Sequence, residues 1–134
     1  MGVKFGAPQD LYESILETCK KIDIKVRGVS FHVGSGGCSF ETYKKPIDLA
    51  RGIFERAKKL GMPEMDFLDL GGGFAVNPLS NPENTFSIVA PKIRKYLNET
   101  NFPGISKVKI IGEPGRFISA EALSIVVQIY LVRE

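Results

Sequence analysis

Two charged side chains lie close together in the motif "GEPGR", which follows an apolar run at Val108–Ile111. Glu113 and Arg116 are separated there by a proline and by Gly115. One interpretation is local, because a carboxylate and a guanidinium on either side of a proline turn can form an ion pair. The other is that both bind one ligand, since a guanidinium suits bidentate contact with an oxyanion and Gly115 offers a backbone N–H. The motif alone leaves both interpretations open.

A second candidate site is the glycine triplet Gly71, Gly72 and Gly73, which follows the apolar run Phe67–Leu70. Consecutive residues without a Cβ let backbone N–H groups approach an anion closely, and the dipole of a following helix would help. The structural alternative is a sharp turn from strand to loop. The triplet lacks the G-x-G-x-x-G spacing of a dinucleotide fingerprint. It therefore indicates a phosphate site without identifying the ligand.

A third apolar run, Val26–Val33, ends in the segment "FHVGSGG". This segment contains the only histidine of the chain, His32, and a serine between glycines, Ser35. Ser35 could supply a hydroxyl to a phosphate, but the segment lacks the G-x-S-x-G spacing of a nucleophile elbow. We keep both residues as candidates for ligand binding, with a purely structural role of His32 as the alternative.

Helical patterns separate these runs, at about Gln9–Ile22, Phe40–Leu60 and Phe86–Leu97. Strand, glycine turn and helix in repetition are typical of βα units, whose ligands collect at the carboxyl ends of parallel strands. Pro46 should kink the second helix or mark its first turn, and Ala120–Val132 fits either helix or strand. Three parallel strands cannot close a barrel and leave two open edges. The sequence therefore predicts an α/β segment of a larger domain.

Composition limits the classes of function. The chain has 134 residues and a net charge of +3 spread along its length, which argues against nucleic-acid binding. Its two cysteines, Cys19 and Cys38, have no metal-binding spacing, so neither a disulfide framework nor a metal site is expected. No apolar run is long enough to span a membrane, and no secretion signal is evident. We therefore expect a cytoplasmic protein.

The three strand ends together favour one ligand. A phosphate held between the loops of neighbouring strands, with a guanidinium, is typical of (β/α)8 barrels. His32 then offers an aromatic ring for stacking, and Glu113 offers a carboxylate. A planar heteroaromatic cofactor with a protonated ring nitrogen needs both, and pyridoxal 5'-phosphate fits that description. A barrel enzyme acting on a sugar phosphate is the weaker alternative, because Glu113 would repel its anion.

The motifs "GVSFHVGSG", "LDLGGGF" and "GEPGR", in this order, closely resemble the eukaryotic-type ornithine decarboxylase family, which are fold-type III enzymes dependent on pyridoxal 5'-phosphate. The resemblance implies that residues 1–123 are part of a TIM (β/α)8 barrel, its last three βα units. Residues 124–134 would begin a C-terminal β-domain, with a strand from about Ser124. It also implies a homodimer that decarboxylates L-ornithine to putrescine for polyamine biosynthesis and that an antizyme-like regulator could bind.

Alternatives within the resemblance are decarboxylases of diaminopimelate or arginine, and antizyme-inhibitor-like homologues that bind partners without catalysis. By position in the motifs, His32 would stack on the pyridine ring and Glu113 would pair with the ring nitrogen. The phosphate would be held by the remaining candidates: Ser35, Gly71, Gly72, Gly73, Gly115 and Arg116. The family's Schiff-base lysine and its β-domain cysteine and aspartates match no residue here. No catalytic residue is therefore assigned, and these 134 residues alone are expected to be inactive.

Overall fold

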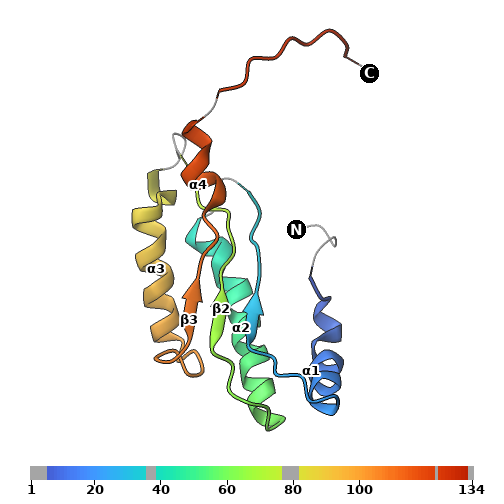
Figure 1. The fold of residues 1–134 in the computed structure, drawn as a ribbon. Coiled ribbons are helices and arrows are strands. Elements are labelled where there is room, and N and C mark those ends of the chain that lie inside the picture. The colour runs from blue at the N-terminus through green and yellow to red at the C-terminus, as the bar shows by residue number, and fades with distance from the viewer. Residues whose placement is uncertain (1–5, 36–38, 77–81, 123, 133–134) are drawn as a thin grey trace.

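The centre of the molecule is a parallel sheet (Figure 1). The computed structural model describes four stretches of the chain: residues 6–35, 39–76, 82–122 and 124–132. Three strands form the sheet in the order β1-β2-β3: β1 (Gly28–Ser30), β2 (Phe67–Asp69) and β3 (Lys109–Ile111). Leu68 in the middle of β2 pairs with Val29 of β1 and with Ile110 of β3. The predicted α/β organisation with a parallel sheet is confirmed.

Helices connect the strands. They are α1 (Tyr12–Lys21), α2 (Phe40–Lys59), α3 (Phe86–Glu99) and α4 (Gly115–Ser119), with 3-10 turns at Gln9–Leu11, Pro82–Asn84 and Ala120–Ala122. The first three follow the predicted periodicity, whereas α4 was not predicted. Helix α2 begins at Phe40 and contains Pro46 in its interior, so of the two alternatives for Pro46 the first-turn position is wrong. Among the described residues, no helix combines the length and apolar character needed to cross a membrane.

The hydrophobic core lies between the sheet and helices α2 and α3. Both helices repeat buried residues three or four positions apart, which places them on one face of each helix. These residues are Tyr43, Ile47, Ala50, Phe54 and Ala57 of α2, and Val89, Ile93 and Leu97 of α3. Leu68 of β2 is buried in the same core, whereas Phe67 and Asp69 point to the opposite face because side chains alternate along a strand.

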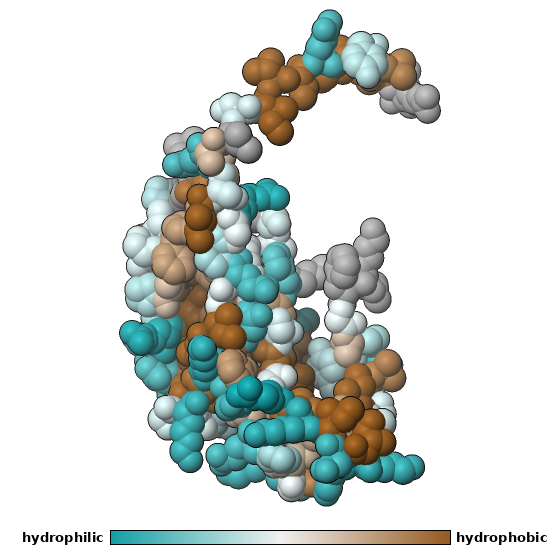
Figure 2. Space-filling model, viewed as in Figure 1, coloured by the Kyte–Doolittle hydropathy of each residue, from teal (hydrophilic) through white to brown (hydrophobic). Residues whose placement is uncertain are grey.

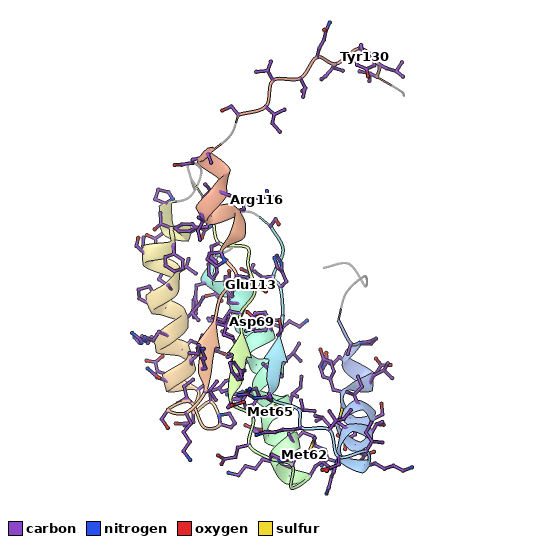
Figure 3. All side chains as sticks on the ribbon, in the orientation of Figure 1. Met62, Met65, Asp69, Glu113, Arg116 and Tyr130 are labelled. Carbon is purple, nitrogen blue, oxygen red and sulfur yellow. The ribbon has the colours of Figure 1, made fainter. Side chains whose placement is uncertain are left out.

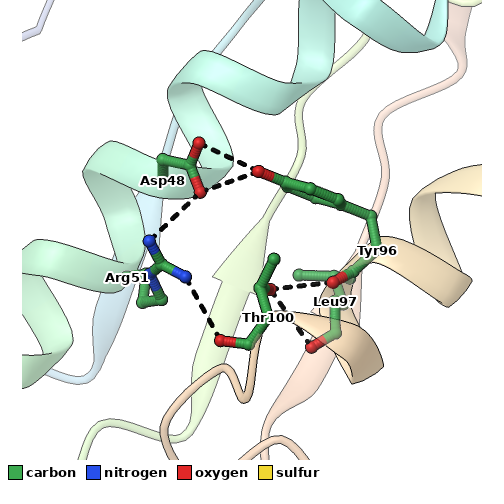
Figure 4. A network of polar contacts seen from close by, with 5 residues as sticks. All are labelled: Asp48, Arg51, Tyr96, Leu97 and Thr100. Carbon is green, nitrogen blue, oxygen red and sulfur yellow. Dashed lines mark hydrogen bonds and ion pairs between the residues drawn. The ribbon is translucent and has the colours of Figure 1, made fainter.

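A polar network joins α2 to the last turn of α3 (Figure 4). The Tyr96 hydroxyl donates to the Asp48 carboxylate, at 3.0 and 2.9 Å from its two oxygens. Arg51 forms an ion pair with Asp48 at 3.5 Å and donates to the carbonyl of Thr100 at 3.2 Å. Burial of Tyr96, and next its hydrogen bond to Asp48, raises the pKa of the phenol. The network fixes the packing of α3 on α2.

Helix α1 lies at one side of the molecule, and polar contacts join it to α2 and to the residue that follows α2. Arg56 of α2 forms an ion pair with Glu13 that contains two hydrogen bonds. Lys20 donates to the carbonyl of Leu60 at 2.5 Å. Leu16 is the one residue of α1 that is fully buried. The docking of α1 therefore depends on charge pairing more than the docking of α3 does.

Residues 124–132 extend away from the body without regular structure (Figure 1). Their apolar side chains are exposed, among them Ile125 at 86% and Val126 at 98% (Figure 2). The predicted strand from Ser124 is not formed here, because strand N–H and C=O groups need a neighbouring strand and no described residue pairs with this segment. The assignment of residues 124–134 to a C-terminal β-domain stays a prediction.

Candidate functional site

A cleft lies at the carboxyl ends of the strands, where the loops after β1, β2 and β3 meet. Its volume is about 150 Å³. Seven of the eight predicted site residues line this cleft: His32, Ser35, Gly72, Gly73, Glu113, Gly115 and Arg116. Figure 3 shows Glu113 and Arg116 beyond Asp69, at the end of the sheet opposite to Met62 and Met65. The eighth residue, Gly71, is buried beneath this lining.

Gly71 ties the ends of the three strands together. Its N–H donates to Oδ1 of Asp69 at 2.9 Å, and its carbonyl accepts from the N–H of Glu113 at 2.9 Å. A Cβ at this position would lie 2.1 Å from the carbonyl oxygen of Phe31, and the backbone has φ +63°, which favours glycine. Since its N–H already has an acceptor, Gly71 supports the turn and offers no free donor to a ligand.

Gly72 and Gly73 provide the free donors of the turn. In the described part of the chain, neither N–H makes a hydrogen bond. A Cβ on Gly72 would lie 2.8 Å from the carbonyl oxygen of Glu113 and 3.1 Å from Nε2 of His32. Only a residue without a side chain leaves this wall of the cleft open. Two unpaired N–H groups on one open wall are suited to bind an anion.

His32 and Ser35 form the rim on the β1 side. Nδ1 of His32 accepts a hydrogen bond from the N–H of Gly34 at 2.9 Å, which leaves the hydrogen of the neutral imidazole on Nε2. The ring is thus oriented by its own loop, with Nε2 next to Gly72. Both His32 and Ser35 are exposed to the cleft. The ring can offer a flat surface to a bound ligand.

Glu113 and Arg116 form the opposite rim, after β3. Both side chains are exposed, and no ion pair joins them or pairs either with another described residue. The local alternative, an ion pair across the proline turn, is therefore absent. Arg116 lies in the first turn of α4, while the Gly115 N–H donates to the Glu113 carbonyl at 2.8 Å. The predicted free N–H of Gly115 is thus engaged within the turn.

Sequence reasoning missed three residues of the cleft, Phe74, Pro114 and Phe117. The two phenylalanines belong to one aromatic series, in which Phe86 lies between them. Phe74 contacts Phe86 of α3 with ring centroids 5.2 Å apart, and Phe86 contacts Phe117 of α4 at 5.2 Å. Each of the two directly follows a predicted motif, "GGG" or "GR". Their position beside the motifs was the available signal, but an aromatic residue at a strand end more often belongs to the core.

The geometry fits a ligand that is anionic at one end and cationic at the other. Arg116 and the N–H groups of Gly72 and Gly73 supply positive potential. Glu113 supplies an acceptor for a charged N–H group, and His32 supplies an aromatic face in the same cleft. Pyridoxal 5'-phosphate has a phosphate, a flat ring and a basic ring nitrogen, so the residues present fit this cofactor.

Comparison with known proteins supports the same cofactor. The model of the family described as "Pyridoxal-dependent decarboxylase, pyridoxal binding domain" matches residues 1–120. Ornithine decarboxylase of Mus musculus is 40% identical over 131 residues, which cover 96% of this chain and 27% of that protein. Antizyme inhibitor 2 of Xenopus laevis is 39% identical over 136 residues, covering 100% of this chain and 28% of that protein.

A solved structure agrees with these matches. The arginine decarboxylase of Paramecium bursaria Chlorella virus, bound to agmatine, superposes with a TM-score of 0.72 at 34% identity, over 87% of this chain and 30% of that one. The chain therefore spans less than a third of the length of the relatives it matches. Because the family model matches nearly the whole chain and the cleft has the matching donors, this chain belongs to the pyridoxal-binding domain family of pyridoxal-dependent decarboxylases, whose cofactor is pyridoxal 5'-phosphate.

Proposed function

We propose that this chain is the cofactor-binding part of a carboxy-lyase that converts L-ornithine to putrescine and CO2. One observation carries the proposal. Glu113 and Arg116 face the same cleft, and neither has a charged partner among the described residues. Because the two opposite charges line one cleft without pairing, each is available to a different part of a ligand.

The phosphate end of the cofactor would lie against Arg116 and the glycine turn. The guanidinium can contact two phosphate oxygens at once, and the free N–H groups of Gly72 and Gly73 can donate to the others. Ser35 adds a hydroxyl on the far rim. Gly71 and Gly115 would act indirectly, because their N–H groups are engaged with Asp69 and with Glu113.

The ring end would lie between His32 and Glu113. The carboxylate of Glu113 would accept a hydrogen bond from the ring nitrogen and hold the proton on that atom. When bound, the cofactor supplies an electron sink for the electron pair released as CO2 leaves, and a protonated ring nitrogen strengthens it. His32 would pack on the face of the ring and exclude water from it.

The sheet and its helices would be the last three βα units of a (β/α)8 barrel. The parallel order β1-β2-β3 and the position of the cleft at the carboxyl strand ends support this. The homodimer, the antizyme-like regulator and the cytoplasmic location stay predictions for the full-length protein. The 134 residues alone are predicted to be inactive, because no residue here matches the Schiff-base lysine of the family.

A test of the substrate uses the full-length protein with pyridoxal 5'-phosphate. Release of CO2 is measured from carboxyl-labelled L-ornithine, L-arginine, L-lysine and diaminopimelate, each at several concentrations. We expect the highest kcat/KM with L-ornithine. A higher kcat/KM with another of these amino acids would support a decarboxylase but reject L-ornithine as its substrate. The comparison of kcat/KM between L-ornithine and L-arginine matters most, because the solved relative described above is an arginine decarboxylase bound to agmatine.

A second candidate function is partner binding without catalysis. It is favoured by the 39% identity to antizyme inhibitor 2 of Xenopus laevis. Intact Glu113 and Arg116 argue against it, since a protein without chemistry at this cleft has no physical need for a ring-nitrogen partner opposite a phosphate clamp. Binding of antizyme by the full-length protein, together with absence of CO2 release from every substrate tested, would support this second function.

A further inference from the structure

We propose that Tyr43 is a positioning residue that turns the backbone of the glycine triplet toward the phosphate of the cofactor. This inference deepens the proposed function and rests on it. Tyr43 lies on α2 and does not line the cleft, so it would act through Gly72 rather than touch the ligand.

The contact that supports this role is a hydrogen bond from a buried hydroxyl. Tyr43 has an exposed fraction of 0%, and its hydroxyl donates to the carbonyl of Gly72 at 3.2 Å. The ring is stacked on Phe74, with centroids 5.7 Å apart and planes inclined by 16°. Tyr43 therefore contacts the turn at two points, through its hydroxyl at Gly72 and through its ring at Phe74.

The direction of the Gly72 carbonyl decides the direction of the next N–H. In a trans peptide the C=O of one residue and the N–H of the next point to opposite sides, and no cis peptide occurs among the described residues. Tyr43 holds the Gly72 carbonyl toward α2. The N–H of Gly73 therefore points away from α2, on the side where Gly73 lines the cleft.

Glycine backbone is easily rotated, so this orientation needs a restraint. Gly73 has φ +96°, a conformation that costs glycine little and that does not lock the peptide. The Gly73 N–H has no acceptor in the described part of the chain that could hold it in place. The hydrogen bond from Tyr43 supplies the restraint from the other side of the peptide. A phosphate would then meet a donor already aimed at it.

The experiment compares two hydroxyl deletions in the full-length protein. Tyr43→Phe removes the donor to Gly72 and keeps the ring on Phe74. Tyr96→Phe is the matched control, because its hydroxyl bonds Asp48 in the α2–α3 network and Tyr96 does not line the cleft. Equilibrium dissociation constants are measured for pyridoxal 5'-phosphate and for pyridoxal, which lacks the phosphate, and thermal unfolding is followed for each variant.

We expect Tyr43→Phe to weaken binding of pyridoxal 5'-phosphate about two- to tenfold, the range of an ordinary hydrogen bond, and to leave binding of pyridoxal unchanged. Both variants should lower the midpoint of thermal unfolding to a similar degree, because each loses one hydrogen bond. Tyr96→Phe should change neither of the two dissociation constants. Equal weakening of both ligands by Tyr43→Phe, or no weakening, would overturn the role of Tyr43 and leave the proposed function in place. A wild-type protein that binds both ligands equally would overturn the phosphate site itself, and this inference with it.

Discussion

The backbone N–H of Glu113 donates to the carbonyl of Gly71 at 2.9 Å, which joins the turn after β3 to the turn after β2. A side chain at position 71 would not fit, because the carbonyl of Phe31, which follows β1, occupies the space of a Cβ. Three segments far apart in sequence thus meet at one glycine. Glu113 and the glycines Gly72 and Gly73 are held in the lining of a single cleft as a result.

Replacing Glu113 by glutamine should separate chemistry from binding. The amide keeps the size of the side chain but loses the charge that holds a proton on the ring nitrogen. In the full-length protein we expect little change in cofactor affinity and a fall in kcat on the order of a hundredfold or more. Steady-state kinetics and cofactor titration of Glu113→Gln check this. Loss of cofactor with normal turnover per bound cofactor would contradict the assigned role.

Replacing Arg116 by alanine should act on retention of the cofactor. The guanidinium is exposed on the cleft and has no carboxylate partner in the described part, so its removal breaks no ion pair there. We expect a loss of binding free energy of about 1.5–3 kcal/mol, the value of a hydrogen bond to a charged group. Arg116→Lys should recover part of it, since lysine keeps the charge without the bidentate geometry. An unchanged dissociation constant of the cofactor would be the contrary result.

Gly71 should tolerate no side chain. An alanine there would place its Cβ 2.1 Å from the Phe31 carbonyl oxygen, at φ +63°. We expect Gly71→Ala to lower the free energy of unfolding by more than about 2 kcal/mol, because backbone strain adds to the clash. Gly52→Ala is the matched control: Gly52 lies within α2 with nothing within 4 Å of a Cβ, so the change should stabilise by about 0.5–1 kcal/mol. Chemical denaturation measures both, and equal effects would refute the packing described for Gly71.

Acidification should loosen α1. The hydrogen bond from Arg56 lowers the pKa of Glu13 below its ordinary value of 4.5. Because the pKa is lower in the folded state, this pair stabilises the fold above pH 4.5, and the contribution is lost as the pH falls through the folded-state pKa. The free energies of unfolding of wild type and Glu13→Gln should therefore differ at about pH 7 and converge at about pH 2.

A control for this titration is Glu55→Gln, since Glu55 is exposed on α2 and forms no ion pair in the described part of the chain. It should show a smaller difference from wild type at about pH 7. Identical pH profiles for Glu13→Gln and Glu55→Gln would mean that the pair with Arg56 contributes nothing to the docking of α1.

The positions of the strands and the grouping of the site could be predicted because each apolar run ends in glycines that cannot continue it. Contacts between residues far apart in the sequence could not be predicted in this way. The hydroxyl of Tyr43 reaches Gly72 only after α2 has packed on the sheet, and on sequence alone Tyr43 reads as one more core position. Helix α4 was missed because it is only five residues long and begins with a glycine, a poor helix former. The strand from Ser124 was predicted from β-branched residues, but propensity forms no strand without a neighbour to pair with.

The most direct test of the central claim is a crystal structure of the full-length protein with pyridoxal 5'-phosphate. We predict phosphate oxygens within hydrogen-bonding distance of Arg116 and of the Gly72 and Gly73 N–H groups, with the ring nitrogen facing the Glu113 carboxylate. A phosphate bound elsewhere, or an ion pair between Glu113 and Arg116 in the presence of the cofactor, would contradict the account.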